Sequence, residues 1–462
     1  MITISKLNTE IERCRGFIRI SSISLCISVS QYSISAGAQS WTMQQCMQYA
    51  VEHNHEVKRA ELELDNYKAS KTGAIGRFLP SVDASIGAQY NFGRAIDPET
   101  NTYTDVSTFY NGYSLSASLP VFDGFNRLHA LKAAKASELM GQSALRQQQN
   151  QTALGVLQAY ANVAYYDGLV KMSNEKVEET RLLLQQTRVM EEVGRKSAAD
   201  VALVESQQAE ADYELTRQQN FYASALLELK KAMAFPLNDS LTLDYIPKVG
   251  TLCSQEGNET FPRWEYYFNR DLSPELQKAH YQKQASKHEW RQAQASLFPS
   301  LSLSGGLSTT YYKTLHSESA ASFSSQFHNN MGEYLGATLS IPLFNRLQTL
   351  TSIRKAKNNY RIACENYEQK QLELEKLSRE AWQDLQAYQK QAVQMKEKVE
   401  ADSIVYQLTR RQFEEGLSTA IDLHTTSVEL LKSKATLLQC QLMAMVKEQL
   451  VRYYRGEAIW TE

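Results

Sequence analysis

The sequence predicts an α+β membrane protein built by internal duplication, in which each copy supplies two β-strands and one long helical hairpin. Three observations predict this fold class: a repeated set of motifs, two long intervals without proline, and short segments in which apolar and small polar residues alternate. Four strands are too few to close a barrel, because about eight are needed around a filled interior. The pattern therefore implies oligomerisation, and three protomers would give a 12-strand transmembrane β-barrel with four strands per protomer.

Composition limits the alternatives. The 462 residues include 49 Lys and Arg against 51 Asp and Glu, so no overall field would attract nucleic acid. No stretch approaches the roughly 18–20 apolar residues of a membrane-spanning helix, so a crossing of the bilayer would require a closed barrel.

Phosphate-binding loops and hydrolase motifs do not occur in the sequence, so we expect neither an enzyme nor a cofactor. His53 and His55 would point in different directions on a helix, which predicts no metal site.

The N-terminus has the features of an export signal. Basic residues up to Arg19 precede a moderately apolar run over 20–34, and the following residues, 35–38, end in a small-x-small sequence whose last residue is Ala38. We therefore expect a signal peptide over residues 1–38. The cysteines that follow have no paired short spacing and are expected to be separate buried residues: Cys46, Cys253, Cys364 and Cys440.

Two copies of one unit follow the signal. The segment Leu119–Gly124 recurs 222 residues later as Ile341–Arg346. The same shift relates three further pairs: Gly194 and Gly416, Ser197 and Thr419, and Asp200 and Asp422. Repeated motifs in a constant order indicate a tandem duplication. We expect the first copy over 39–245, an irregular segment over 246–272, and the second copy over 273–457.

The intervals without proline predict helical hairpins over 124–235 and 345–455. Proline breaks helix interiors, and none lies between Pro120 and Pro236 or after Pro342. In the second interval apolar residues recur in steps of three and four, which is the spacing of a coiled coil. The long helices would run over about 124–193 and 345–414. Each would end at a C-capping glycine and be followed by a capping box with Asp in place of Glu.

The segments before the hairpins predict strand pairs over 80–122 and 299–343, because apolar and small polar residues alternate there with period two. A transmembrane barrel and a half-buried soluble sheet share this alternation, and the export signal and the helix lengths favour the barrel. Pro120 and Pro342 mark the expected strand exits. Phe122 and Phe344 follow them, where an apolar plug and ordinary packing are both compatible with the sequence.

The order of helix, strand pair and long hairpin, present twice, resembles the TolC-like outer-membrane efflux proteins along 41–457. Its recurring marks are the opening helix after Trp41, the Pro-Ser pairs at 80–81 and 299–300, the strand-exit prolines and the Gly-to-Asp turns. The resemblance implies a homotrimer whose barrel lies in outer-membrane lipid and continues as a long α-helical barrel through the periplasm. Residues 246–272 would form an equatorial belt around this tunnel, and the segments 94–109 and 313–330 would be extracellular loops.

The function that the resemblance implies is a passive exit duct of a tripartite efflux or type I secretion system. An inner-membrane pump would deliver the substrates through a periplasmic adaptor protein. The alternative is a soluble periplasmic coiled-coil scaffold, whose apolar strand face would point into a protein core instead of lipid.

The resemblance also places the hairpin turns at the periplasmic entrance, where they would meet the adaptor. These positions are Gly194, Arg195, Ser197 and Asp200 in the first turn and Phe413, Gly416, Ser418, Thr419 and Asp422 in the second. The best-known member locks its second turn with a tyrosine and an arginine and has two aspartates in a cation-binding ring. The matching positions here are Phe413, Ser418, Asp422 and Thr425, so one aspartate is matched and the arginine is absent.

Without that arginine, we expect other contacts to close the entrance, with Arg195 or Lys196 as the basic partner. Asp422, repeated around a threefold axis, would attract cations, and the pKa of its carboxyl would rise. Asp200 and Asp422 would alternatively only cap their helices, and the two roles are compatible.

Overall fold

The computed structural model describes residues 40–96, 102–105, 107–244, 273–315, 321–457 and 459–460. The expected signal peptide over 1–38 and the expected equatorial segment over 246–272 lie outside these residues.

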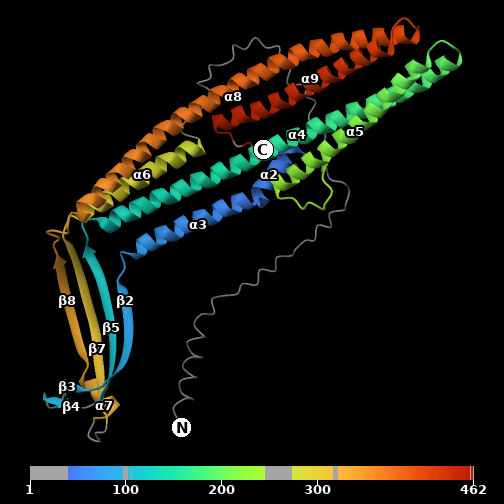
Figure 1. The fold of residues 1–462 in the computed structure, drawn as a ribbon. Helices are drawn as coiled ribbons and strands as arrows, with labels where there is room; N and C mark the ends of the chain where they lie inside the picture. Colours follow the sequence, from blue (N-terminus) through green and yellow to red (C-terminus); the bar gives the residue numbers. More distant parts are fainter. Residues whose placement is uncertain are drawn as a thin grey trace, which may run out of the picture. The chain divides into compact units, whose positions relative to one another are not determined.

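Long helices occur in two sets of equal length (Figure 1). The helices are α2 (Met43–His53), α3 (His55–Gly76), α4 (Asn126–Glu192), α5 (Ala198–Met233), α6 (Pro274–Ala295), α7 (Phe323–Asn329), α8 (Gln348–Glu414) and α9 (Ala420–Arg455). The first copy has helices of 22, 67 and 36 residues, α3, α4 and α5. In the second copy α6, α8 and α9 have the same three lengths in the same order.

No helix in the described part of the chain contains an apolar stretch of the length that a lipid bilayer requires.

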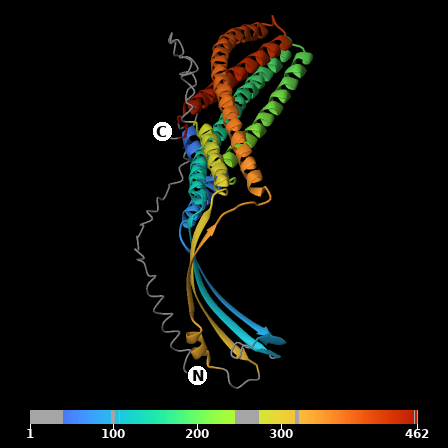
Figure 2. The same ribbon diagram turned by 90° about the vertical axis from the view of Figure 1, so that its left-hand side faces the viewer.

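The described strands form one large sheet and two small ones. The small sheets are β1 (Ser40–Trp41) with β6 (Thr242–Leu243) and β3 (Arg94–Ile96) with β4 (Tyr103–Asp105). The large sheet has the order β2 (Ser81–Asn91), β5 (Thr108–Phe122), β7 (Ser300–Thr314) and β8 (Gly332–Ser340), with every neighbouring pair antiparallel. Its strands bend along their length (Figure 2).

The strand register places apolar residues on one face of this sheet and small polar residues on the other. Ile86 lies opposite Tyr113, and Leu115 lies opposite Leu307, so apolar side chains share one face. Ser114 lies opposite Ser85 on one side and Ser308 on the other, so the second face is small and polar. Large residues on the apolar face are strongly exposed in the single chain, including Ile86 at 75% and Leu335 at 88%.

The strand ends differ from the sequence prediction. β8 ends at Ser340, so Pro342 and Phe344 lie beyond the strand that we expected to run to residue 343. Conversely, β5 continues through Pro120 to Phe122, and the register with β7 shifts between these two residues. Proline has no N–H for the ladder, and an irregularity of this kind lets a strand accommodate it.

Two expected loops contain regular structure as well. The segment expected as a loop over 94–109 includes the hairpin of β3 and β4, and the one over 313–330 includes α7. Gln326 of α7 accepts a hydrogen bond from the backbone N–H of Tyr312 at 2.9 Å and donates one to the carbonyl of Tyr312 at 2.9 Å. β8 begins at Gly332, opposite Ser308 of β7, so α7 supplies partners to the part of β7 beyond Ser308.

The order of the helices repeats the order of the strands. α4 contacts both α3 and α6, and α6 also contacts α8, so these four helices lie in one row. The chain joins α3 to β2, β5 to α4, α6 to β7 and β8 to α8. Each strand therefore continues into one helix of the row (Figure 1).

The strand-to-helix joints have the same geometry in both copies. Gly124 and Phe125 have φ of 65° and 69°, and Arg346 and Leu347 have φ of 57° and 64°. Two consecutive left-handed residues thus turn the chain into α4 and α8. The positive φ suits glycine, and side chains larger than hydrogen adopt it at a cost.

The main core lies where the two copies meet around α2, α4, α5 and α9. Cys46, Val156 and Leu229 are fully buried there. Tyr160 is 2% exposed, and its hydroxyl donates a hydrogen bond to the carbonyl of Asp244 at 2.8 Å. The described cysteines are unpaired: Cys46, Cys364 and Cys440.

Candidate functional site

The two hairpin turns lie at the same end of the long helices, opposite to the large sheet (Figure 1). Gly194 and Gly416 have φ of 74° and 80°, the left-handed conformation that ends a helix. The backbone N–H of Arg195 donates to the carbonyl of Met190 at 2.8 Å, and Leu417 donates to Gln412 at 2.7 Å. Both turns therefore close the preceding helix in the same way.

Each return helix begins with a capping box. The Asp200 N–H donates to the hydroxyl of Ser197 at 3.2 Å, and the Ser197 N–H donates to the Asp200 carboxylate at 3.0 Å. Thr419 and Asp422 form the same pair of bonds at 3.2 and 3.1 Å. Ser418 adds a hydroxyl donor 3.4 Å from the Asp422 carboxylate. The capping function of both aspartates is thus present in the single chain.

The capping hydrogen bonds also shift the pKa values of both aspartates. Hydrogen bonds from the backbone and side chain of Ser197 hold the pKa of Asp200 below its usual value. Hydrogen bonds from the side chain and backbone of Thr419 lower the pKa of Asp422. Within one chain the cap therefore opposes the rise in pKa that we expected, because its donors stabilise the carboxylate.

A small hydrophobic core joins the two turns. Phe413, at the end of α8, is 1% exposed and packs with Leu183 of α4 and Val204 of α5. Ala420 and Leu423 of α9 complete this tip core. Because its members come from both hairpins, the tip core holds the first hairpin against the second.

Lys196 adds a charge to this contact. Its ammonium lies 4.0 Å from the centroid of the Phe413 ring, a cation–π distance. Of the two basic residues expected to take part in closure, Lys196 therefore reaches the second hairpin, whereas Arg195 is exposed.

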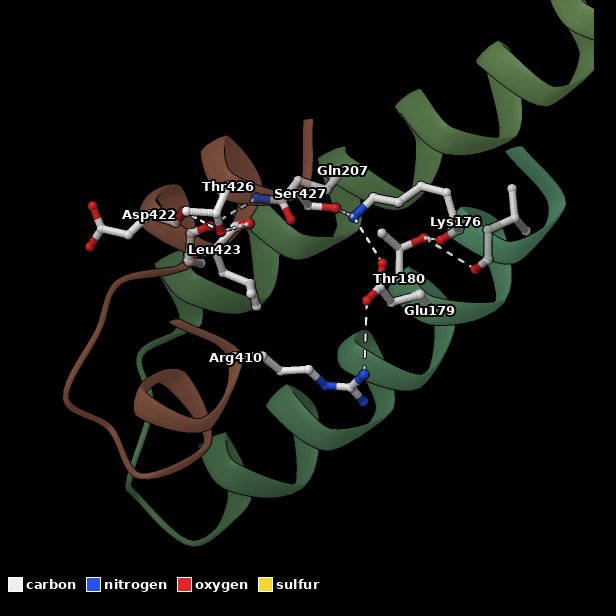
Figure 3. A network of polar contacts seen from close by, with 11 residues as sticks. Lys176, Glu179, Thr180, Gln207, Arg410, Asp422, Leu423, Thr426 and Ser427 are labelled. Carbon is white, nitrogen blue, oxygen red and sulfur yellow. Dashed lines mark hydrogen bonds and ion pairs between the residues drawn. The ribbon is translucent and has the colours of Figure 1, made fainter. Parts of the chain in front are cut away.

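Polar contacts between the hairpins lie beside the tip core (Figure 3). The ammonium of Lys176 in α4 donates to the hydroxyl of Ser427 in α9 at 2.5 Å. Arg410 of α8 lies 3.8 Å from the carboxylate of Glu179 in α4. The amide of Gln207 in α5 donates to the carbonyl of Ala420 at 3.4 Å. Sequence reasoning did not predict these cross-hairpin contacts.

Divergence between the two copies accounts for them. In the first hairpin Arg188 pairs with Glu205 of the return helix at 2.6 Å. Arg410 corresponds to Arg188, but Ser427 stands where the shift of 222 places the counterpart of Glu205. Arg410 pairs instead with Glu414 of its own helix at 3.3 Å and with Glu179 of the first hairpin at 3.8 Å. Comparing charges between the copies would have revealed this change.

A cavity of about 430 Å³ lies between α4, α5 and α9 next to these contacts. Met172 of α4, Glu214 of α5 and Val428 of α9 are among its lining residues. The side-chain oxygen of Gln218, another lining residue, is buried without a partner in the described structure. The hairpins are thus closely packed at the tip core and less closely packed behind it.

The remaining predicted site residues lie elsewhere. Pro120 and Phe122 belong to the end of β5, at the sheet end of the long helices, and Phe122 packs on Phe125 with ring centroids 5.5 Å apart. Pro342 and Phe344 lie in the joint before α8, where Phe344 is 79% exposed. The predicted site residues therefore form two groups at opposite ends of the helices.

No group of three or more His, Cys, Asp or Glu side chains in the part of the chain that the structure describes could hold a metal ion. His53 instead stacks on Tyr49 and contacts its own helix backbone.

Comparison with known proteins identifies relatives over most of the chain. The family model of the outer membrane efflux proteins matches residues 46–234 and 269–452. The probable efflux pump outer membrane protein TtgC of Pseudomonas putida is 21% identical over 437 residues, which cover 90% of this chain and 84% of that protein.

Two solved structures superimpose on most of this chain and show the same fold. CusC superimposes with a TM-score of 0.78 at 16% identity, covering 90% of this chain and 92% of that one. The outer membrane protein VceC of Vibrio cholerae superimposes with a TM-score of 0.75 at 14% identity, covering 90% and 96%.

Proposed function

Because the chain belongs to the outer membrane efflux protein family, we propose that it forms an outer-membrane channel of a tripartite export system. It would be a passive exit duct without catalytic residues or cofactor. Its substrates would come from an inner-membrane pump through a periplasmic adaptor protein. The observation that carries this proposal is the large sheet, whose apolar face is exposed and whose edge strands β2 and β8 each have one side without a strand partner among the described residues.

The edges of the sheet support a closed homotrimer. Successive strands alternate in direction, so β2 and β8 run antiparallel to one another. The β2 strand of a second copy could therefore pair with β8 and continue the alternation. Three copies would close 12 strands, with the apolar face toward lipid and the serine-rich face toward the lumen.

The hairpin turns would form the periplasmic entrance of this duct. Their contacts link the hairpins within one chain: the tip core around Phe413, the Lys176–Ser427 hydrogen bond and the Arg410–Glu179 ion pair. Separation of the two hairpins would break all three. We propose that these contacts hold the entrance closed in place of the arginine lock that the chain lacks.

The duct is tested by the mass of the purified full chain in detergent, with the detergent subtracted, and by conductance in a planar bilayer. We expect about three chains per particle and a channel of low conductance. A chain that stays soluble without detergent as a monomer or dimer would refute the duct and support the periplasmic scaffold.

The entrance is tested by a double variant, Lys176→Met with Arg410→Gln. We expect a higher conductance than in the wild type, because two links between the hairpins are lost while the sheet is untouched. Arg411→Gln is the matched control, since Arg411 is exposed on the same helix end. Equal conductance of the double variant and the wild type would refute the role of these links in closure.

A further inference from the structure

Positive charge is concentrated where the long helices meet the large sheet. We define the basic collar as residues 66–77, 126–137, 284–295 and 346–357, which lie next to the sheet in α3, α4, α6 and α8 and their joints. These segments contain 12 Lys and Arg and one acidic residue, Glu289. The whole chain has 49 basic and 51 acidic residues, so the collar is a local segregation of charge.

Most of the collar cations have no acidic partner. Lys68, Lys71 and Arg127 form ion pairs at 2.7–2.8 Å. Nine others are exposed and form no ion pair within the described structure: Arg77, Lys132, Lys135, Lys287, Arg291, Arg346, Arg354, Lys355 and Lys357. On the hairpins, by contrast, helical cations commonly have acidic neighbours one turn away, such as Glu375 beside Arg379.

The collar segments lie side by side. Arg127 at the start of α4 donates a hydrogen bond to the carbonyl of Arg77 at 3.3 Å. His129 of α4 and His288 of α6 have ring centroids 5.7 Å apart, and the ammonium of Lys357 in α8 lies 5.8 Å from the centroid of the Trp290 ring in α6. Lys132 stands one turn after His129, and Arg291 one turn after His288, so both cations share a helix face with these rings. The cations therefore form a continuous band and are not scattered along four separate helices.

The positive charges of the collar affect His129 and His288. Burial lowers the pKa of both rings, and the positive charges of Arg291 and Lys132 lower it further. The Nδ1 atoms of His129 and His288 are buried without a hydrogen-bond partner in the described structure. The charged groups that shift the pKa of the two rings are thus all positive.

Exposed apolar side chains separate the collar from the sheet. Leu79 is 65% exposed, Phe298 56% and Leu343 91%, and each lies in a joint between helix and strand. Along the molecule, an apolar sheet face is thus followed by apolar joints and then by unpaired cations. A membrane has the complementary order, with hydrocarbon followed by headgroups that carry phosphate.

We propose that the basic collar binds the headgroups of anionic phospholipids, in the leaflet on the helical side of the barrel. This inference rests on the proposed membrane barrel and adds a lipid preference to it. The apolar joints next to the cations fit a lipid surface better than they fit an acidic protein. Lysine and arginine supply the donors that phosphate accepts.

The test compares retention of two lipids by the full chain. Wild type is incorporated into vesicles of phosphatidylcholine alone or mixed with phosphatidylglycerol, and native mass spectrometry then measures the ratio of the two lipids that it retains. The collar variant carries Lys132→Gln, Lys287→Gln, Arg354→Gln and Lys355→Gln. The control removes four exposed cations of the hairpins: Arg181→Gln, Arg217→Gln, Lys231→Gln and Lys376→Gln.

One cation at an anionic surface changes partition about fivefold, so we expect the collar variant to lose at least about tenfold of its preference for phosphatidylglycerol. The hairpin control should keep the wild-type preference. Equal preference in wild type and collar variant would overturn the proposal, as would a collar variant that changes only the ion selectivity of the channel. Failure to enter vesicles of either composition would overturn the barrel itself, whereas incorporation without preference would overturn only the collar.

Discussion

Ser197 and Asp200 stabilise the start of α5 by hydrogen bonds that depend on an ionised carboxylate. The pKa of Asp200 is lower in the folded chain than its ordinary value near 3.8. Its contribution is therefore complete above that value and is lost as the pH falls through the lower folded-state pKa. The spacing of Ser197 and Asp200 revealed this cap in the sequence, because a capping box depends on neighbours three residues apart.

Ser197→Ala removes the hydroxyl that accepts from Asp200, and we expect a loss of about 1 kcal/mol in the local stability of the first turn of α5. Hydrogen exchange of the amides in that turn measures the change. Asp200→Asn should weaken protection at neutral pH and approach the wild type at acidic pH, where both side chains are uncharged. Equal protection of wild type and Asp200→Asn at neutral pH would contradict this role.

Gly124 is a second residue whose identity the structure explains. A Cβ at this position would lie 2.5 Å from the carbonyl oxygen of Ala295 and 2.8 Å from Cβ of Phe298, and φ is positive. We expect Gly124→Ala to destabilise the protein by more than 1–2 kcal/mol, since left-handed strain and a backbone clash add together. Thermal unfolding of the purified chain is the measurement.

Gly155→Ala is the matched control for Gly124→Ala. Gly155 lies inside α4 with open space around its Cβ position. Alanine should stabilise the helix there by about 1 kcal/mol. Destabilisation of equal size at both glycines would show that the joint imposes no special constraint.

The elements of this protein differ in how much of them the sequence predicts. Helices without proline, with glycine ends and capping boxes, were expected over 124–193 and 345–414 and occupy 126–192 and 348–414. Local sequence rules are therefore sufficient to predict the two long helices. Strand ends depend on partners elsewhere in the sheet, so local patterns predicted neither the end of β8 at Ser340 nor its start at Gly332, before which α7 takes its place beside β7.

The cross-hairpin contacts depend on which helix faces meet. No local pattern links Arg410 to Glu179 or Lys176 to Ser427, since the partners are more than 200 residues apart. Only the loss of a glutamate between the two copies indicated that the second hairpin pairs differently. Lys196 was expected to take part, but its partner, the Phe413 ring, follows from packing alone.

The tip core should hold the two helical hairpins together. Phe413 is almost fully buried, so Phe413→Ala should cost about 3–5 kcal/mol of local stability and should also remove the contact with Lys196. Hydrogen exchange near the ends of α4 and α8 measures this loss. Leu417→Ala is the control, because Leu417 is 76% exposed, and it should leave exchange unchanged. Equal effects of the two substitutions would contradict a shared core.

For the whole molecule, the two faces of the sheet determine where the protein can reside. Leu335 lies on the apolar face, and Thr338, three residues further along β8, lies on the serine-rich face. Both side chains are exposed in the single chain. Exposure in the single chain therefore does not distinguish the two side chains. In a membrane barrel, Leu335 would face lipid and Thr338 would face the lumen.

Leu335→Arg should lower the yield of membrane-inserted protein, because arginine near the bilayer midplane costs about 2–4 kcal/mol on a lipid-facing strand. Thr338→Arg should insert normally, since its side chain would enter the aqueous lumen, and should instead change the conductance. Separation of membrane and soluble fractions, followed by conductance measurements, checks both outcomes. Insertion that is reduced equally by both variants would argue against the assigned faces.

The uninterrupted length of α4 and α8 has a mechanical consequence. Each has 67 residues, so it is a lever arm of about 100 Å with its fixed end at the sheet. A rotation of the helix by about 6° about its end at the sheet would displace its other end by about 10 Å. The tips can therefore travel far while the strands barely tilt, so the membrane end can keep its seal while the other end opens.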